Sequence, residues 1–333
     1  MGFLEGHIAE EKVFNGKVFP KTLLPPMSLV PGEPDLAETV KAEREWIAKT
    51  LQEHGAILFR GFDIRCAEDY SCVIKAFGWE EFCYQGPADR IKLADRVYTA
   101  NAVPSDIMIS FHHEMAMIKE FPSRIMFFCQ QPPPVGGQTT IISSSVVVEK
   151  VEEELPQVLE KMEQDGIIFT LHTKSIYKNS TTSDPLAGTV WQRMLKTTDE
   201  VEAKKRALDM LACNNVKFNS DGTACFTFGP MNPIREFNGK RVMFNRVVGY
   251  ETGERDAFVT FGDGSPVPSN ATETIKKIYE ENCVDINWQK GDILLVDNLA
   301  VQHARRPEVF RGLCWCHSRT EPHEMKLIDR TSH

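Results

Sequence analysis

The sequence lacks the motifs of several common enzyme classes, and these absences narrow what the chain can do. No Gly-x-Gly-x-x-Gly fingerprint follows a predicted strand, and no Gly-x-x-x-x-Gly-Lys-[Ser/Thr] loop is present. These absences argue against the common nucleotide-binding folds. The helical His-Glu-x-x-His pair of many zinc proteases is also missing. No Cys-x-x-Cys pair occurs among the nine cysteines, which predicts reduced thiols and no disulfide framework. No cysteine lies in a sequence pattern that is typical of a catalytic nucleophile.

Long apolar segments and an excess of basic residues are absent as well. No stretch approaches the roughly 18–20 apolar residues that span a bilayer, and the N-terminus does not follow the pattern of a secretory signal. We therefore expect a cytoplasmic protein with no membrane partner. The net charge of −9 argues against a nucleic-acid partner, because binding to phosphates requires clustered lysine and arginine. Hydrophobic residues make up 42% and charged residues 26% of the 333, an ordinary balance for a globular protein with a large core.

Proline and glycine divide the chain into a short arm and one large domain. Residues 20–34 are rich in proline and are expected to be extended. We interpret residues 1–34 as an N-terminal arm and residues 35–333 as a single domain with helical insertions. Asp35 is expected to cap a helix over 36–53, and Gly55 to end it.

Short apolar runs separated by turn residues make up most of the remaining sequence. Because these runs recur with few helices between them, the pattern predicts an antiparallel β-sandwich or barrel decorated by helices, and not a doubly wound sheet. Further helices are expected over 67–77, 146–163 (with Pro156 interrupting or kinking it), 186–213 and 269–282. Strands are expected over 56–62, 124–129, 140–148, 167–171, 216–219, 224–228, 242–248, 284–288, 293–297 and 313–317.

Two histidines and a glutamate form a candidate metal site. In an extended segment, residues i and i+2 share a face, so His112 and Glu114 would point the same way and His113 the opposite way. A His-x-Glu pair alone is most often a surface feature. His303, however, follows a strand that should be buried, which would make a rigid platform for a third ligand. Two histidines and one carboxylate form the facial triad of non-haem Fe(II) oxygenases, although the same set also binds catalytic zinc.

Five sequence blocks occur in an order that resembles the TauD/TfdA superfamily of 2-oxoglutarate oxygenases, and in particular the clavaminate synthase-like proteins of plants. The blocks are GAILFRGF (55–62), FHHEMA (111–116), GGQT (136–139), FGDGSPVP (261–268) and WQKGDILLVDNLAVQH (288–303). The last block is the most specific of the five.

This resemblance implies a mainly β fold with helices around a double-stranded β-helix (jelly-roll) core. It implies an Fe(II)- and 2-oxoglutarate-dependent dioxygenase that oxidises, by default hydroxylates, a small organic substrate with O₂. By the same resemblance, His112, Glu114 and His303 are the iron ligands, and Thr139 hydrogen-bonds the carboxylate of 2-oxoglutarate. A zinc hydrolase on a β-barrel and a non-catalytic jelly-roll that binds a metal or ligand are the alternatives.

The sequence departs from the family pattern after His303. Family members place an arginine on the last core strand, where its planar guanidinium pairs with the distal carboxylate of 2-oxoglutarate. Arg311 fits the local Arg-x-Leu pattern but comes early, and Arg319 comes late. Arg305 and Arg306 are expected in the preceding loop. We prefer Arg311. If neither candidate mattered, the chain would either use another cation or have lost the use of 2-oxoglutarate, and the binding-protein alternative would become the better interpretation.

Overall fold

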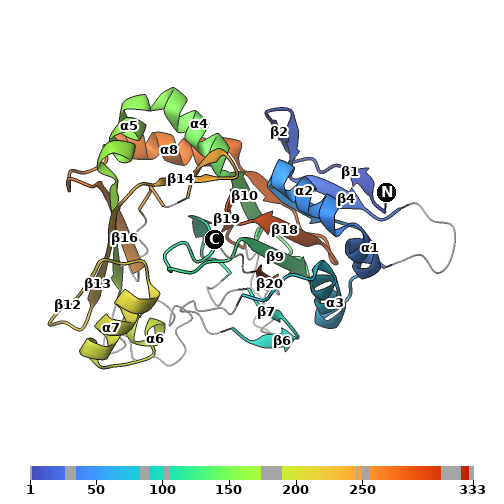
Figure 1. Ribbon diagram of the computed structural model, residues 1–333, viewed down its shortest axis with the longest axis horizontal. Coiled ribbons are helices and arrows are strands. Elements are labelled where there is room, and N and C mark those ends of the chain that lie inside the picture. Colours follow the sequence, from blue (N-terminus) through green and yellow to red (C-terminus); the bar gives the residue numbers. More distant parts are fainter. Residues whose placement is uncertain are drawn as a thin grey trace.

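An eight-stranded sheet in the order β1-β4-β5-β18-β9-β20-β7-β6 is the largest layer of the computed structural model (Figure 1). The structure describes residues 2–26, 35–82, 90–100, 105–173, 190–244, 246–249, 255–308 and 324–329. Within this sheet β4 and β5 are parallel, and the other pairs are antiparallel. Its strands are β1 (Leu4–Gly6), β4 (Lys21–Leu24), β5 (Ala56–Phe59), β18 (Ile293–Asp297), β9 (Arg124–Cys129), β20 (Glu324–Asp329), β7 (Val97–Thr99) and β6 (Lys92–Ala94). Two of them come from the expected N-terminal arm.

Three helices, α1 (Leu36–Ala42), α2 (Arg44–His54) and α3 (Ala67–Phe77), cover one face of this sheet. The Asp35 side chain accepts a hydrogen bond from the Glu38 amide at 2.8 Å, which is the predicted N-cap of α1. Gly55 ends α2 in the left-handed conformation at φ 75°, as predicted. The expected single helix is divided at Glu43, which caps α1 and precedes α2.

A smaller sheet packs against the opposite face of the large sheet, so the two form a sandwich. Alternate residues of the large sheet, such as Leu58, Phe127 and Leu294, share a core with Ile141 and Val301 of the small sheet. The small sheet has the order β17-β10-β19-β8. Its strands are β17 (Val284–Ile286), β10 (Thr139–Ser143), β19 (Val301–Arg305) and β8 (Ile109–His112).

His303 follows the buried strand β18, as expected, but the expected position of Arg305 in a loop was wrong. Both residues lie inside β19, which pairs with β10 on one side and with β8 on the other. The segment Val-Gln-His-Ala-Arg has polar residues at three of its five positions, two of them adjacent, so its sequence does not resemble a buried strand. The segment nonetheless forms a buried strand, because pairing with β10 and β8 provides hydrogen-bond partners for its backbone.

A third sheet, in the order β12-β13-β11-β16, packs against α6 (Trp191–Met194) and α7 (Glu200–Met210). Its strands are β12 (Asn215–Phe218), β13 (Ala224–Met231), β11 (Ile167–Thr173) and β16 (Arg255–Phe261). Helices α4 (Ser144–Glu154), α5 (Pro156–Asp165) and α8 (Ser269–Asn282) form a further layer at the top of Figure 1. Two hairpins complete the described structure, β2 (Lys12–Phe14) with β3 (Lys17–Phe19) and β14 (Ile234–Phe237) with β15 (Lys240–Met243).

Residues 140–148 do not form one strand as expected, since β10 ends at Ser143 and α4 begins at Ser144. The valines at 146–148 are β-branched, which favours a strand. In the structure Val147 and Val148 are buried with Ile275 and Ile278 of α8, so tertiary packing overrides the local preference. The break expected at Pro156 is present, because α4 ends at Glu154 and Pro156 begins α5. The expected strand over 313–317 lies outside the described residues.

Among the described residues, none of the helices is both long enough and apolar enough to span a bilayer.

Candidate metal centre

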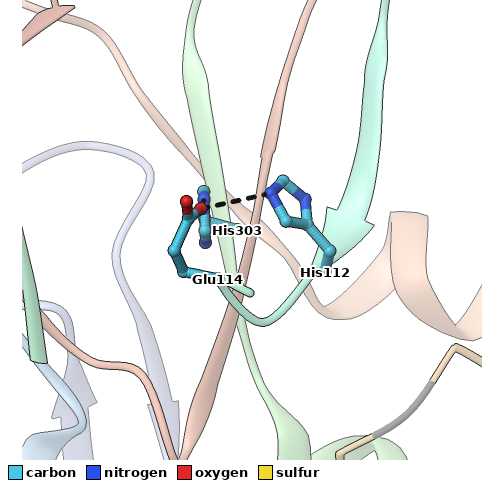
Figure 2. Close-up of side chains that lie close together, drawn as sticks. All are labelled: His112, Glu114 and His303. Carbon is cyan, nitrogen blue, oxygen red and sulfur yellow. Dashed lines mark ion pairs between the residues drawn. The ribbon is translucent and has the colours of Figure 1, made fainter. Parts of the chain in front are cut away.

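His112, Glu114 and His303 come together between the two sheets of the sandwich, although His303 is far from the other two in sequence. One ligand atom from each side chain lies within 4.8 Å of the other two (Figure 2). Glu114 Oε2 is 3.6 Å from His112 Nε2 and 3.5 Å from His303 Nε2. The two imidazole rings are 4.2 Å apart at their centroids. Three donors therefore converge on one point.

The pairing of β19 with β8 sets the two histidines side by side. His303 lies directly opposite His112, so both side chains leave the same face of the small sheet. The next pair is Arg305 with Ile109, which places one extra residue in β8 beside the site. Such a β-bulge bends a strand and re-aims its side chains, and bulges are common next to active sites.

Glu114 does not lie in an extended strand, contrary to the expectation for the His-x-Glu pair. Strand β8 ends at His112, and Glu114 begins a turn in which Met115 has a φ of 59°. The turn is held by Asn298, whose Oδ1 accepts from the Glu114 amide at 2.7 Å. Asn298 Nδ2 donates to the Glu114 carbonyl at 3.1 Å and to the Pro122 carbonyl at 2.7 Å.

His113 points away from the other two histidines, into the protein core. Its Nδ1 lies 2.5 Å from the Asn298 carbonyl, and its Nε2 lies 2.9 Å from Ser144 Oγ and 3.2 Å from the Met243 carbonyl. The ring stacks on Phe244 with centroids 4.5 Å apart. Burial lowers the pKa of His113 to about 4, so the ring is neutral at physiological pH. These contacts indicate that His113 has a structural role and is not a metal ligand.

The donor set fits a divalent transition metal. Imidazole nitrogen and carboxylate oxygen are ligands that both iron and zinc accept. The Glu114 and His303 side chains are each 7% exposed, whereas that of His112 is 22% exposed, so the cluster is most open at His112. His112 Nδ1 contacts the Ser110 carbonyl at 2.8 Å. That contact sets the ring so that Nε2 faces Glu114, which is how histidine ligands are usually oriented.

Thr139, the predicted co-substrate residue, lies on the same face of the small sheet as His303. It is at the start of β10, is 1% exposed, and stands opposite Arg305. Its hydroxyl oxygen accepts a hydrogen bond from Trp288 Nε1 at 3.2 Å. Because an indole N–H can only donate, the proton of the Thr139 hydroxyl must point elsewhere.

Arg305 is a cation on this face that the sequence pattern did not predict. It lies two residues after His303 in β19, is 5% exposed, and donates to the Ile107 carbonyl at 2.8 Å. Alternation along β19 would have revealed it, had the segment been recognised as a strand. Arg306 points elsewhere and pairs with Glu280 at 2.8 Å and Asp285 at 3.1 Å. Arg311 and Arg319 lie outside the described residues.

Comparison with known proteins gives relatives along nearly the whole chain. Residues 28–312 match the model of the family described as taurine catabolism dioxygenase TauD, TfdA family. A clavaminate synthase-like protein from Arabidopsis thaliana is 37% identical over 329 residues, which cover 93% of this chain and 98% of that protein. The dapdiamide synthesis protein DdaC from Enterobacter agglomerans is 26% identical over 288 residues, with 80% of this chain and 82% of that protein covered.

Solved structures with low sequence identity share the fold. The protein AAD-2, in complex with Mn(II) and N-oxalylglycine, has a TM-score of 0.53 at 11% identity, with 100% of this chain and 99% of that chain covered. An asparagine oxygenase, in complex with Fe(II), 3-hydroxyasparagine and succinate, has a TM-score of 0.51 at 12% identity, with 87% of this chain and 79% of that chain covered. At these identities the likeness concerns the fold alone.

Proposed function

The chain belongs to the taurine catabolism dioxygenase TauD, TfdA family, and we propose that His112, Glu114 and His303 hold the iron of this Fe(II)- and 2-oxoglutarate-dependent dioxygenase. The single observation that supports this assignment best is the convergence of the three ligand atoms within 4.8 Å. The ligand set alone left a zinc hydrolase open, and membership of a dioxygenase family favours iron over zinc. We further propose that the reaction hydroxylates a small organic substrate with O₂ in the cytoplasm.

When bound, iron would couple the reduction of O₂ to two oxidations, the oxidative decarboxylation of 2-oxoglutarate and the oxidation of the substrate. The protein's own residues hold and orient the reactants. Three protein ligands on one side leave the remaining positions for the co-substrate and O₂. Since Glu114 and His303 are each 7% exposed, their side of the site excludes water, while the more open His112 side is the proposed side of entry.

The co-substrate is proposed to lie along the face of β10 and β19 that carries Thr139. The Thr139 hydroxyl, which accepts from Trp288, would hydrogen-bond a carboxylate of 2-oxoglutarate. Arg305, opposite Thr139, adds positive charge at the same place. This charge matters because a buried carboxylate without a cationic partner is costly.

The distal carboxylate of 2-oxoglutarate is assigned to Arg311 in preference to Arg319. The grounds are those of the sequence, since Arg311 begins the Arg-Gly-Leu that resembles the family's local pattern. We also propose that the two facing sheets form the jelly-roll that the family resemblance implies, within one domain over 35–333 to whose large sheet the arm adds β1 and β4. The facing core of the two sheets is consistent with this arrangement.

The function is tested by succinate release from 2-oxoglutarate under air with Fe(II) and a panel of small organic acids and amino acids. We expect succinate to form only with Fe(II), and faster in the presence of at least one panel member. Zn(II) should not replace Fe(II). Hydrolysis supported by Zn(II), with no succinate in any reaction, would contradict the proposal.

A further inference from the structure

The two carboxylate oxygens of Glu114 face different partners. Oε2 faces the two histidines, at 3.5 Å from His303 and 3.6 Å from His112. Oε1 lies 3.6 Å from Nη2 of Arg90. The arginine side chain is 9% exposed and that of Glu114 is 7% exposed, so this ion pair is poorly screened by solvent. Arg90 is therefore a charged partner on the side of Glu114 away from the histidines.

The position of Arg90 is fixed by contacts that do not involve Glu114. Its Nη1 donates to the Thr99 carbonyl at 2.8 Å and also to the Ala100 carbonyl, at the end of β7. The backbone around it is held too, since the Ile91 amide donates to Thr99 Oγ1 at 3.1 Å and the Thr99 amide to the Ile91 carbonyl at 3.0 Å. A guanidinium is a rigid fork, so two bonds at Nη1 determine where Nη2 points.

We propose that Arg90 is a positioning residue for the metal ligand Glu114, an inference that rests on the proposed function. By attracting Oε1, the preset guanidinium turns the carboxylate so that only Oε2 faces the histidines. This orientation aims one carboxylate oxygen of Glu114 at the point where the two histidines converge, and its loss would weaken metal binding. Hydrogen-bonded or charged partners of metal ligands commonly have this orienting role.

The inference is tested by metal binding without turnover, with Mn(II) as a redox-stable probe whose free form is measured by electron paramagnetic resonance. Arg90→Gln removes the charge and should weaken Mn(II) binding roughly ten- to a hundredfold. It should also change the line shape of bound Mn(II), which reports the symmetry of the ligand set. Arg90→Lys keeps the charge but not the rigid fork, so it should bind Mn(II) more tightly than Arg90→Gln and less tightly than the wild type.

Arg96→Gln is the matched control. Arg96 lies in the turn of the same β6–β7 hairpin and donates to the Trp79 carbonyl at 2.8 Å, so its loss tests any effect of loosening the hairpin. This variant should bind Mn(II) as the wild type does. Wild-type affinity and line shape in Arg90→Gln would overturn the inference, and so would an equal loss of affinity in Arg96→Gln or in Arg90→Lys.

Glu114→Ala separates this inference from the proposed metal centre. If Glu114→Ala abolishes Mn(II) binding while Arg90→Gln leaves it unchanged, only the role of Arg90 fails. If Glu114→Ala binds Mn(II) like the wild type, the metal centre itself is wrongly assigned, and the inference fails with it.

Discussion

The side-chain amide of Asn298 pairs with the backbone of Glu114, accepting from its amide at 2.7 Å and donating to its carbonyl at 3.1 Å. Asn298 is fully buried and follows β18 directly. A residue next to one core strand therefore fixes the turn that presents Glu114 to the histidines on β8 and β19. The asparagine of the late sequence block thus has a structural reason, in addition to its place in the family pattern.

Asn298→Ala is the first test of this arrangement. The change leaves the buried amide and carbonyl of Glu114 without these partners, which typically costs about 1–3 kcal/mol of the free energy of unfolding. Because the turn also aims the Glu114 side chain, Fe(II) affinity should fall as well. Urea unfolding measures the first effect and anaerobic Fe(II) titration the second. Loss of stability with unchanged Fe(II) affinity would mean that the turn does not depend on Asn298.

Thr139 and Trp288 are tested together through the requirement for 2-oxoglutarate. Thr139→Val keeps the shape but removes a hydrogen bond to a charged group, which is worth about 1.5–3 kcal/mol, or roughly ten- to a hundredfold in affinity. Trp288→Phe removes only the bond that orients the hydroxyl, worth about 0.5–1.5 kcal/mol, or roughly two- to tenfold. Fe(II) affinity should not change in either variant. An unaltered requirement in Thr139→Val would make Thr139 only a turn residue.

Arg305 and Arg306 are adjacent in sequence, but we expect only Arg305 to affect the binding of 2-oxoglutarate. Arg305→Gln should raise the KM for 2-oxoglutarate about tenfold or more, because a charge-assisted contact is lost from the face that carries Thr139. Arg306→Gln should leave the KM unchanged, since Arg306 pairs with Glu280 and Asp285 outside the site. Equal effects of the two changes would remove Arg305 from the co-substrate pocket.

Arg311 and Arg319 are ranked by the same assay. Arg311→Ala should weaken 2-oxoglutarate binding far more than Arg319→Ala, because Arg311 is the arginine that resembles the family's Arg-x-Leu pattern. The opposite ranking would transfer the role to Arg319. If neither change mattered, a cation elsewhere, with Arg305 the first candidate, would have to bind the distal carboxylate.

The spacing of apolar residues in the sequence correctly predicted several helices and strands whose apolar side chains pack into the core. The helices over 67–77 and 269–282 and the strands over 124–129 and 293–297 were placed with the correct bounds. Each has a clear apolar pattern and lies next to turn or capping residues. The resemblance to the TauD/TfdA superfamily is confirmed by the family match over 28–312.

Features that depend on long-range pairing were not predicted. Strand β20 has no strong strand signal of its own and is defined by its pairing with β9 and β7. Arg90 lies in no recognisable motif. Only the fold brings it close to Glu114, which lies 24 positions further along the chain. The turn at Glu114 was read as extended because its cause, Asn298, is distant in sequence.

The most direct test of the central claim is the stoichiometry of Fe(II) bound anaerobically to the wild type, to His303→Ala and to His113→Ala. We expect about one Fe(II) per chain in the wild type and none in His303→Ala, because two remaining ligands do not complete the facial triad. His113→Ala should be less stable but should keep its iron, because His113 contacts Asn298, Ser144 and Met243 and faces away from the ligands. Unchanged stoichiometry in His303→Ala, or loss of iron from folded His113→Ala, would contradict the assignment of the metal centre.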